Sequence, residues 1–253
     1  PGLLMRAGPA ELVTFAGVTA AKLPGTKPIE ARFERLGEMF EALRARGITE
    51  LCLAGAMTRP SFDAAALDGT TRALLPRLMM AMGRGDDGLL REVMAILEEQ
   101  GFKIVAAQDL RPDLVAEAGN LVSSPSPAQL KDAERGRAVL AALAPLDVGQ
   151  SAVVARGQLL GIETLQGTDA MLAFVVATAK PITKDAGGVL IKRPKAGQDL
   201  RVDVPVIGPK TIAAAAEAGL KGIEIAAGAV LLLDRAKVIA AAQTMGLALW
   251  AAP

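Results

Sequence analysis

Short apolar runs alternate with longer amphipathic segments along most of this 253-residue chain, and that alternation limits the folds open to it. Residues 12–15 and 50–53 are apolar enough to form strands. Between them, residues 33–46 carry apolar side chains at helical spacing before Gly47. A strand, a helix and a second strand in this order predict a right-handed parallel crossover. The pattern recurs toward the C-terminus, so we predict an α/β protein.

A break in composition near mid-chain predicts two domains. Residues 121–130 are small, polar and rich in proline, as expected of a linker. The preceding segment, 1–120, predicts a Rossmann-like domain with a parallel sheet. The following segment, 131–253, contains two short apolar runs joined by Arg156-Gly157 and predicts an α/β domain with a mixed sheet. A cleft between two such domains is the expected place for a ligand.

The composition excludes several classes of mechanism. The chain has no histidine and no tyrosine, so a Ser-His-Asp triad, a Cys-His pair and an imidazole metal ligand are impossible. Its one cysteine, Cys52, lies in an apolar run, where we expect a buried thiol in an intracellular protein. A net charge of +1 with six Phe and one Trp gives nucleic acid neither a basic footprint nor a stacking platform. Carboxylates, lysines, hydroxyls and backbone dipoles must therefore carry any chemistry.

The densest polar cluster runs from Lys192 to Pro205. Three cations precede Asp199, and Arg201 and Asp203 alternate so that a strand edge would place both on one face. A carboxylate among cations stays ionised, which suits it to hold a divalent ion beside a phosphate. The alternative is a solvated basic hairpin with one salt bridge, and charge alone favours that alternative.

Three glycine-containing segments offer weaker signals. Gly167-Thr168-Asp169 opens an apolar helix, where Thr168 or Asp169 can be the N-cap and the helix terminus can receive an anion or a metal-binding carboxylate. Gly149 is most simply the C-terminal glycine of the preceding helix. Gly55 directly follows a strand, where a parallel sheet places its ligand crevice.

Several motifs become specific when they are taken together, in order and spacing. They are Ala54-Gly55-Ala56 with Arg59-Pro60-Ser61-Phe62, Arg84-Gly85-Asp86-Asp87, Leu146-Asp147-Val148-Gly149-Gln150, Glu163 with Gly167-Thr168-Asp169-Ala170-Met171, and Lys195-Ala196-Gly197-Gln198-Asp199 running into Arg201-Val202-Asp203-Val204-Pro205-Val206-Ile207-Gly208. In this combination the chain resembles the UDP-2,3-diacylglucosamine pyrophosphatase family of the LpxI type.

The resemblance implies a magnesium-dependent cytoplasmic hydrolase of lipid A biosynthesis, with Mn²⁺ as an alternative ion. It would cut UDP-2,3-diacylglucosamine to UMP and 2,3-diacylglucosamine 1-phosphate (lipid X), holding the lipid between two α/β domains. A substrate of this kind also implies peripheral contact with the cytoplasmic face of the inner membrane.

The same resemblance assigns roles to residues. The family's essential aspartate maps onto Asp203, with Val204 where leucine is usual. We expect Asp203 to bind the metal and orient water, with Asp169 as a second carboxylate. Each expected substrate contact has a capping or surface role as its alternative; these contacts are Gly55, Gln150, Thr168, Lys192, Lys195, Gln198 and Arg201.

One departure from the family pattern lies at the front of the chain. Family members begin with a strand and a Gly-Gly-Gly-x-Leu-Pro-like turn that could cradle the uridine diphosphate. This sequence starts near the end of that turn, at Pro1-Gly2-Leu3, so the leading strand and glycine turn are expected ahead of it.

Two other classes of function stay open. A nucleotide-sugar or lipid carrier would use the same cleft without catalysis. A dinucleotide-dependent oxidoreductase would use a Rossmann-like first domain, but the chain has no Gly-x-Gly-x-x-Gly turn after a strand and no His or Tyr for hydride chemistry.

Overall fold

The computed structural model describes residues 10–18, 27–55, 62–83, 86–179, 182 and 187–253. The chain divides into two compact units, Pro1–Arg111 and Pro112–Pro253. This division lies ahead of the linker predicted at 121–130. Both units combine helices and strands, which confirms the predicted α/β class. The expected glycine turn at the front of the chain lies outside the described residues.

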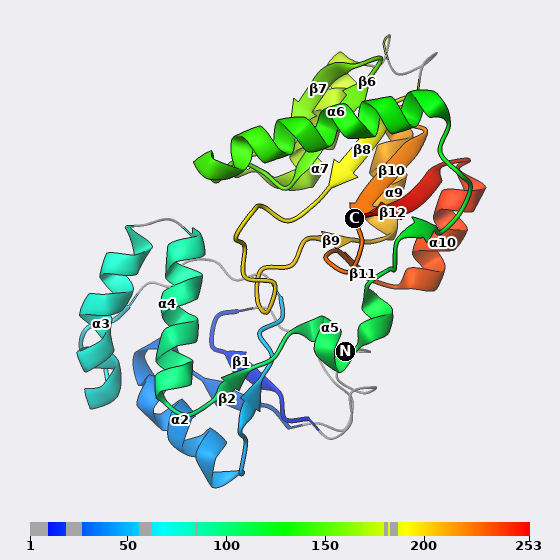
Figure 1. Ribbon diagram of the computed structural model, residues 1–253. Coiled ribbons are helices and arrows are strands. Elements are labelled where there is room, and N and C mark those ends of the chain that lie inside the picture. The colour runs from blue at the N-terminus through cyan, green and yellow to red at the C-terminus, as the bar shows by residue number, and fades with distance from the viewer. Residues whose placement is uncertain (1–9, 19–26, 56–61, 84–85, 180–181, 183–186) are drawn as a thin grey trace. The chain divides into compact units, whose positions relative to one another are not determined.

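The first unit pairs its strands in parallel. β1 lies beside β2, and β3 lies beside β4 (Figure 1). The helix predicted at 33–46 is confirmed, and it buries Phe40 and Leu43. Its elements are β1 (Val13–Phe15), β2 (Ile29–Ala31), η1 (Phe33–Arg35), α2 (Leu36–Ala45), β3 (Glu50–Leu51), α3 (Gly69–Met82), α4 (Asp86–Glu99), β4 (Lys103–Ile104) and α5 (Ala107–Leu110).

A single carboxylate joins the N-termini of two helices in this unit. Asp68 is the N-cap of α3 and accepts the backbone N–H of Thr71 at 2.6 Å. Its other oxygen accepts the backbone N–H of Gly37 at 2.8 Å and of Glu38 at 3.3 Å, in the first turn of α2. Gly37 permits this approach, because a Cβ there would lie 2.8 Å from the Asp68 carboxylate. Asp68 therefore holds α2 against α3.

Replacing Asp68 by alanine is expected to lower the free energy of unfolding of this unit by about 2 kcal/mol, because several backbone donors lose their acceptor. Partial burial raises the pKa of Asp68, but the hydrogen bonds from Thr71, Glu38 and Gly37 lower it by more. The net folded-state pKa lies below the unfolded value, so this stabilisation is present above about pH 4 and is lost as pH falls through the folded-state pKa.

Urea unfolding of both proteins at neutral pH and near pH 3 measures this difference. The matched control is Asp63→Ala, because Asp63 accepts the N–H of Ala65 in an exposed local turn. That control is expected to change the stability by no more than about 0.5 kcal/mol. Equal effects of the two substitutions would contradict the role of Asp68.

The second unit is built on a six-stranded sheet with the order β5-β12-β10-β8-β6-β7. β8, β10 and β12 are parallel, whereas β6 runs antiparallel to both β8 and β7. The predicted mixed sheet is therefore confirmed. Its elements are η2 (Pro112–Leu114), β5 (Gly119–Asn120), α6 (Pro127–Leu143), η3 (Ala144–Leu146), β6 (Ser151–Ala155), β7 (Gln158–Ile162), α7 (Gly167–Thr178), β8 (Val189–Lys192), β9 (Val206–Ile207), α9 (Pro209–Glu217), β10 (Gly222–Ala226), β11 (Leu231–Leu232), α10 (Arg235–Thr244) and β12 (Ala248–Ala252).

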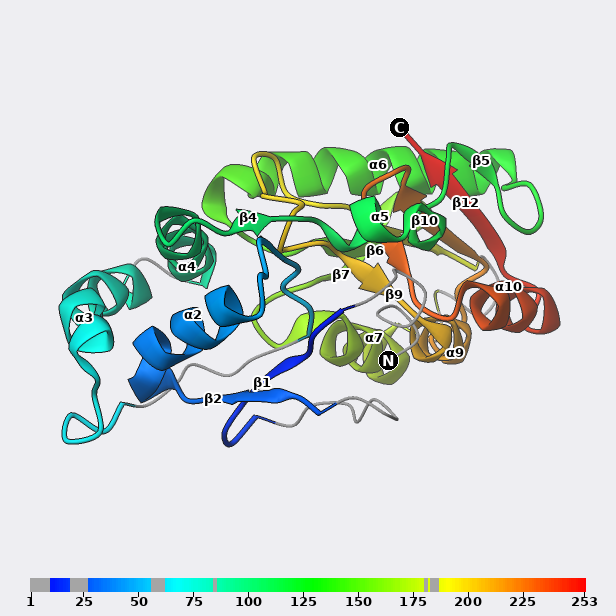
Figure 2. The ribbon, with the colours of Figure 1, turned by 90° about the horizontal axis from the view of Figure 1, so that it is seen from below.

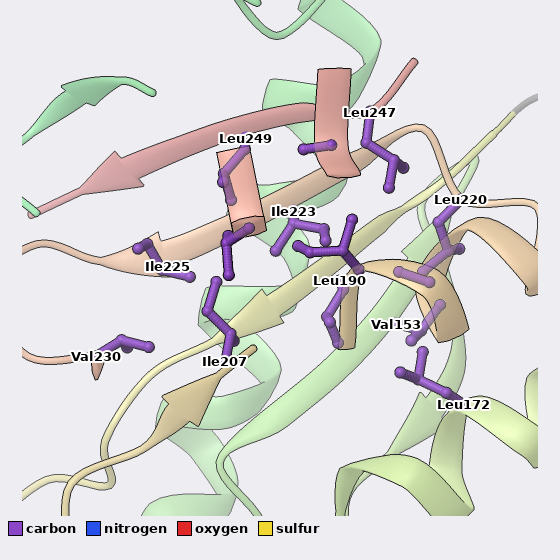
Figure 3. Close-up of a cluster of buried hydrophobic side chains, with 14 of the residues drawn as sticks. Val153, Leu172, Leu190, Ile207, Leu220, Ile223, Ile225, Val230, Leu247 and Leu249 are labelled. Atoms are coloured by element: carbon purple, nitrogen blue, oxygen red, sulfur yellow. The ribbon is translucent and has the colours of Figure 1, made fainter. Parts of the chain in front are cut away.

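Helices cover both faces of this sheet. On one face, α7, α9 and α10 pack against strand residues such as Leu190 and Ile223 in a large apolar core (Figure 3). On the other face, α6 packs against a smaller cluster that includes Ile191 and Trp250. Gly136 of α6 lies so close to the sheet that a Cβ would meet the Ile191 side chain at 2.4 Å. Most strand residues are buried on both faces, as sheets covered on both sides require.

An ion cluster is buried on the α6 side of the sheet. Glu224 of β10 is fully buried and accepts hydrogen bonds from Arg137 at 2.6 Å and from the Trp250 indole at 2.9 Å. Arg193, the residue after β8, lies 3.8 Å from the other Glu224 oxygen. Burial lowers the pKa of Arg193, and Glu224 opposes that shift. This cluster anchors the end of β8 from the face opposite to Lys192.

Candidate active site

The carboxyl edge of the six-stranded sheet collects the polar residues of the second unit. β7 and β8 end there, and β6, which runs the other way, begins there. α7 leads from β7 to β8, and α9 leads toward β10, which is parallel to β8. Both helices therefore begin at this edge (Figure 2). In open α/β sheets, this edge is where ligands bind.

Lys192 forms the centre of a buried polar cluster at this edge. Its side chain is the last of β8 and is only 5% exposed. The ammonium donates to the Thr168 hydroxyl at 2.6 Å and to the Ser151 hydroxyl at 3.1 Å, and it lies 3.5 Å from the Glu163 carboxylate. Thr168 in turn donates to Glu163 at 3.0 Å. We call these four residues the Lys192 cluster.

The electrostatics of this cluster follow from its burial. Desolvation lowers the pKa of the Lys192 ammonium, and the carboxylates of Glu163 and Asp169 oppose that shift. The cation is surrounded by hydrogen-bond acceptors, so it positions neighbouring groups instead of reaching out to a phosphate as a free side chain. Lys192 lies at the sheet edge with its contacts to protein oxygens, and its predicted contact with a substrate stays a prediction.

The backbone brings Glu163 into this position through a close approach. Glu163 follows β7, and its N–H donates to the Ser151 carbonyl at 2.8 Å. Gly149 adopts a φ of 61°, and a Cβ there would lie 2.2 Å from the Glu163 carbonyl oxygen. Gly149 was predicted as the C-terminal glycine of a helix, but the left-handed residue after η3 is Asp147. Gly149 instead allows its loop to pack against Glu163.

The predicted capping role of Thr168 or Asp169 is wrong. The N-cap of α7 is Gln166, and within the described part of the chain no side chain caps this helix. Thr168 lies in the first turn, where its hydroxyl contacts Lys192 and Glu163. Asp169 is exposed and close enough to Lys192 to influence its pKa. The Thr168 hydroxyl binds the buried Lys192 ammonium and does not cap the helix. Capping rules consider only the residues near the start of a helix, so they could not predict this partner.

The segment after β8 is a set of turns, not the strand edge predicted to hold Arg201 and Asp203 on one face. The Asp199 carboxylate accepts hydrogen bonds from Nε and Nη2 of the Arg201 guanidinium, the shortest at 2.7 Å. The Asp203 N–H donates to the Asp199 carbonyl at 3.0 Å, which closes a helical turn. β9 begins only at Val206. Arg201 thus forms the local salt bridge that charge alone favoured.

Gln198 organises the two ends of this segment. Its side-chain oxygen accepts the Lys195 N–H at 2.8 Å, and its amide nitrogen donates to the Asp203 carbonyl at 2.6 Å. The Lys195 ammonium pairs with Asp147. Gln150 accepts the Arg193 N–H at 2.8 Å through its backbone carbonyl. Gln198 therefore fixes the backbone at Asp203, whose side chain is partly buried.

The predicted site residues fall into two groups. Those in the second unit lie at the carboxyl edge of its sheet or on the segment that follows β8. At the edge are Gln150, Thr168, Asp169 and Lys192, and on the segment are Lys195, Gln198, Arg201 and Asp203. Gly55 belongs to the first unit, where it follows β3 with a φ of 108°. Ser151 was not predicted to be part of the site, because its contact with Lys192 depends on the register that pairs these two residues across β6 and β8.

A magnesium ion fits this edge only if the substrate supplies part of its coordination. Across the described ranges, no three Asp, Glu, Cys or His side chains group closely enough to hold a metal. Mg²⁺ commonly takes one or two carboxylates and completes its octahedron with phosphate oxygens and water. Glu163 already contacts Lys192 and Thr168, and the metal-binding roles of Asp203 and Asp169 stay predictions.

Comparison with known proteins decides the family. A family model of the LpxI N-terminal domain matches residues 6–114, and one of the LpxI C-terminal domain matches residues 117–250. The chain belongs to the LpxI family. Over 240 residues it is 40% identical to "UDP-2,3-diacylglucosamine pyrophosphatase LpxI" of Caulobacter vibrioides, an alignment that spans 93% of this chain and 85% of that protein. The resemblance stated from the motifs is thereby confirmed, and the boundary between the two LpxI domains lies close to the division at residues 111 and 112.

Proposed function

We propose that this LpxI-family chain hydrolyses the pyrophosphate bond of UDP-2,3-diacylglucosamine in lipid A biosynthesis, releasing UMP and 2,3-diacylglucosamine 1-phosphate. The observation that carries the proposal is the 40% identity, over nearly the whole chain, to a relative named for that activity. The carboxyl edge of the second unit supports it, because Glu163 and Thr168 of the quoted motifs lie there around the buried Lys192 ammonium.

The residues at this edge suit a diphosphate. Pyrophosphate hydrolysis needs charge neutralisation, a positioned water and little covalent chemistry, so it can proceed without histidine. The first turns of α7 and α9 direct backbone N–H groups and positive dipole ends toward this edge. The Lys192 ammonium adds a fixed positive charge behind the first turn of α7. Together these groups favour the binding of an anion.

In this proposal Asp203 orients the attacking water and accepts its proton, and Asp203 and Asp169 hold Mg²⁺. When bound, Mg²⁺ neutralises charge on the diphosphate oxygens and lowers the pKa of water; Mn²⁺ has the same preference for oxygen ligands. Gln198 keeps the Asp203 backbone in place through its 2.6 Å hydrogen bond. Lys195 and Gln150 lie on the two segments that flank the cluster, and in this proposal they contact the sugar or a phosphate, with Lys195 exchanging its partner Asp147 for the ligand.

The proposed substrate is a lipid, so we also propose that the protein works in the cytoplasm and contacts the inner membrane peripherally. None of the helices in the described residues is long and apolar enough to cross a bilayer. Membrane contact in this proposal therefore means contact with a surface.

Incubation with UDP-2,3-diacylglucosamine, with and without Mg²⁺, tests the proposal through the release of UMP. We expect UMP and 2,3-diacylglucosamine 1-phosphate in equal amounts, and loss of both after chelation. Tight substrate binding without UMP release would favour the lipid-carrier alternative. Binding of NAD in a parallel titration would favour an oxidoreductase.

A further inference from the structure

An apolar groove lies beside the Lys192 cluster. It runs between β7, the terminal strand of the sheet order, and α7, and it has a volume of about 450 Å³. Its walls include Leu159 of β7 and Phe174 of α7, which are 42% and 57% exposed. Apolar surface that is exposed in a contiguous patch commonly marks a binding site.

Close packing between the strand and the helix forms the floor of the groove. Gly161 of β7 lies against α7, where a Cβ would meet the Met171 side chain at 2.9 Å. Met171 is almost fully buried and lines the groove from below. The groove is therefore a preformed feature of the second unit, and its volume falls within the range of small-molecule sites.

One loop connects the groove to the polar cluster. Residues 163–166 link β7 to α7, and both Glu163, at the start of this loop, and Thr168, in the first turn of α7, contact Lys192. Between them, Thr164 and Gln166 line the groove and hydrogen-bond to each other. The site is thus polar at the carboxyl edge and becomes apolar along α7. A ligand that matches this order of polar and apolar surface has a charged head and an apolar tail.

We infer that this groove binds one acyl chain of the diacylated substrate while the phosphates lie at the carboxyl edge of the sheet. The inference rests on the proposed function, because that function supplies a ligand with a diphosphate next to two acyl chains. The groove accounts for the exposure of Leu159 and Phe174, and it gives these two residues, together with Met171 of the core, a role in choosing acyl length. The groove is assigned to an acyl chain and not to the nucleotide part of the substrate.

Binding of the product 2,3-diacylglucosamine 1-phosphate, with acyl chains shortened one methylene at a time, tests the inference without hydrolysis. Concentrations are kept below the critical micelle concentration of each compound. In the wild-type protein, each methylene that leaves the groove is expected to weaken binding by up to about fourfold, the equivalent of roughly 0.8 kcal/mol. Leu159→Glu and Phe174→Glu are expected to weaken long-chain binding at least about tenfold and to flatten this dependence, with little effect on the shortest chains.

The matched control is Leu130→Glu, since Leu130 is 47% exposed on α6, which packs on the opposite face of the sheet. This control should retain the wild-type dependence on chain length. Unchanged dependence in Leu159→Glu and Phe174→Glu would overturn the inference. The inference would also be overturned if the protein forms a dimer that Leu159→Glu and Phe174→Glu dissociate while the dependence on chain length persists. A second copy of the chain would then occupy the groove. Absence of UMP release from the wild type would refute the proposed function, whereas chain-length-dependent binding that the groove variants abolish would still support an acyl site.

Discussion

Replacing Asp203 by asparagine is expected to lower kcat for UMP release by about a thousandfold while changing substrate affinity by no more than a few-fold. The substitution keeps the shape of the side chain and removes its charge, so it loses the metal interaction and the proton acceptor. Each of these is worth several kcal/mol in the transition state of such reactions. The hydrogen bond from Gln198 goes to the Asp203 backbone carbonyl and should survive the substitution.

The matched control for this prediction is Asp199→Asn. Asp199 lies on the same segment, but its carboxylate pairs with Arg201 at 2.7 Å. We expect its loss to reduce kcat less than about tenfold, since a partly exposed pair contributes little. Single-turnover hydrolysis and equilibrium binding of the substrate measure both effects. Hydrolysis that persists in Asp203→Asn at a rate close to that of Asp199→Asn would remove Asp203 from the mechanism.

The second large effect is expected at Lys192. Lys192→Met should lower the free energy of unfolding of the second unit by about 3 kcal/mol, because it leaves the Glu163 carboxylate without its cation in a buried site. It should also lower kcat by about a hundredfold, as the first turn of α7 loses the group that holds Thr168 in place. Denaturant unfolding and UMP release measure the two effects independently.

Two further variants separate the loss of the ion pair from a general loss of packing. In Lys192→Met combined with Glu163→Gln, part of the lost stability should return, because no unpaired charge remains. Lys195→Met should cost less than about 1 kcal/mol, since its partner Asp147 is largely exposed. An equal loss of stability in Lys192→Met and Lys195→Met would contradict the role assigned to the Lys192 cluster.

Much of the fold could be predicted because it depends on local patterns. The apolar spacing in residues 33–46 requires an amphipathic helix, and that helix forms as η1 and α2. The runs joined by Arg156-Gly157 form the antiparallel pair of β6 and β7, which makes the sheet mixed. Ser126 caps α6 in a capping box with Gln129, so the proline-rich segment predicted as a linker leads directly into a helix. Proline at the first helical position reads equally well as a loop residue, which is why the sequence pattern suggested a linker there.

The candidate site depended on contacts that local sequence does not contain. Thr168 and Lys192 were both predicted from the sequence, and the structure places them in contact, whereas the role of Asp203 stays a prediction. Ser151 joined them only because the register of β6 and β8 places it opposite Lys192, and register is set by the packing of whole strands. Likewise, alternation suggested a strand at residues 201–203, but the Asp199–Arg201 pair and the hydrogen bond to the Asp199 carbonyl stabilise a turn there.

The most direct test of this account is a crystal structure of Asp203→Asn bound to UDP-2,3-diacylglucosamine. The account predicts that the diphosphate lies at the carboxyl edge of the six-stranded sheet, close to the first turn of α7 and to residue 203. A diphosphate bound at the opposite edge of that sheet, or held entirely by residues 1–111, would contradict it.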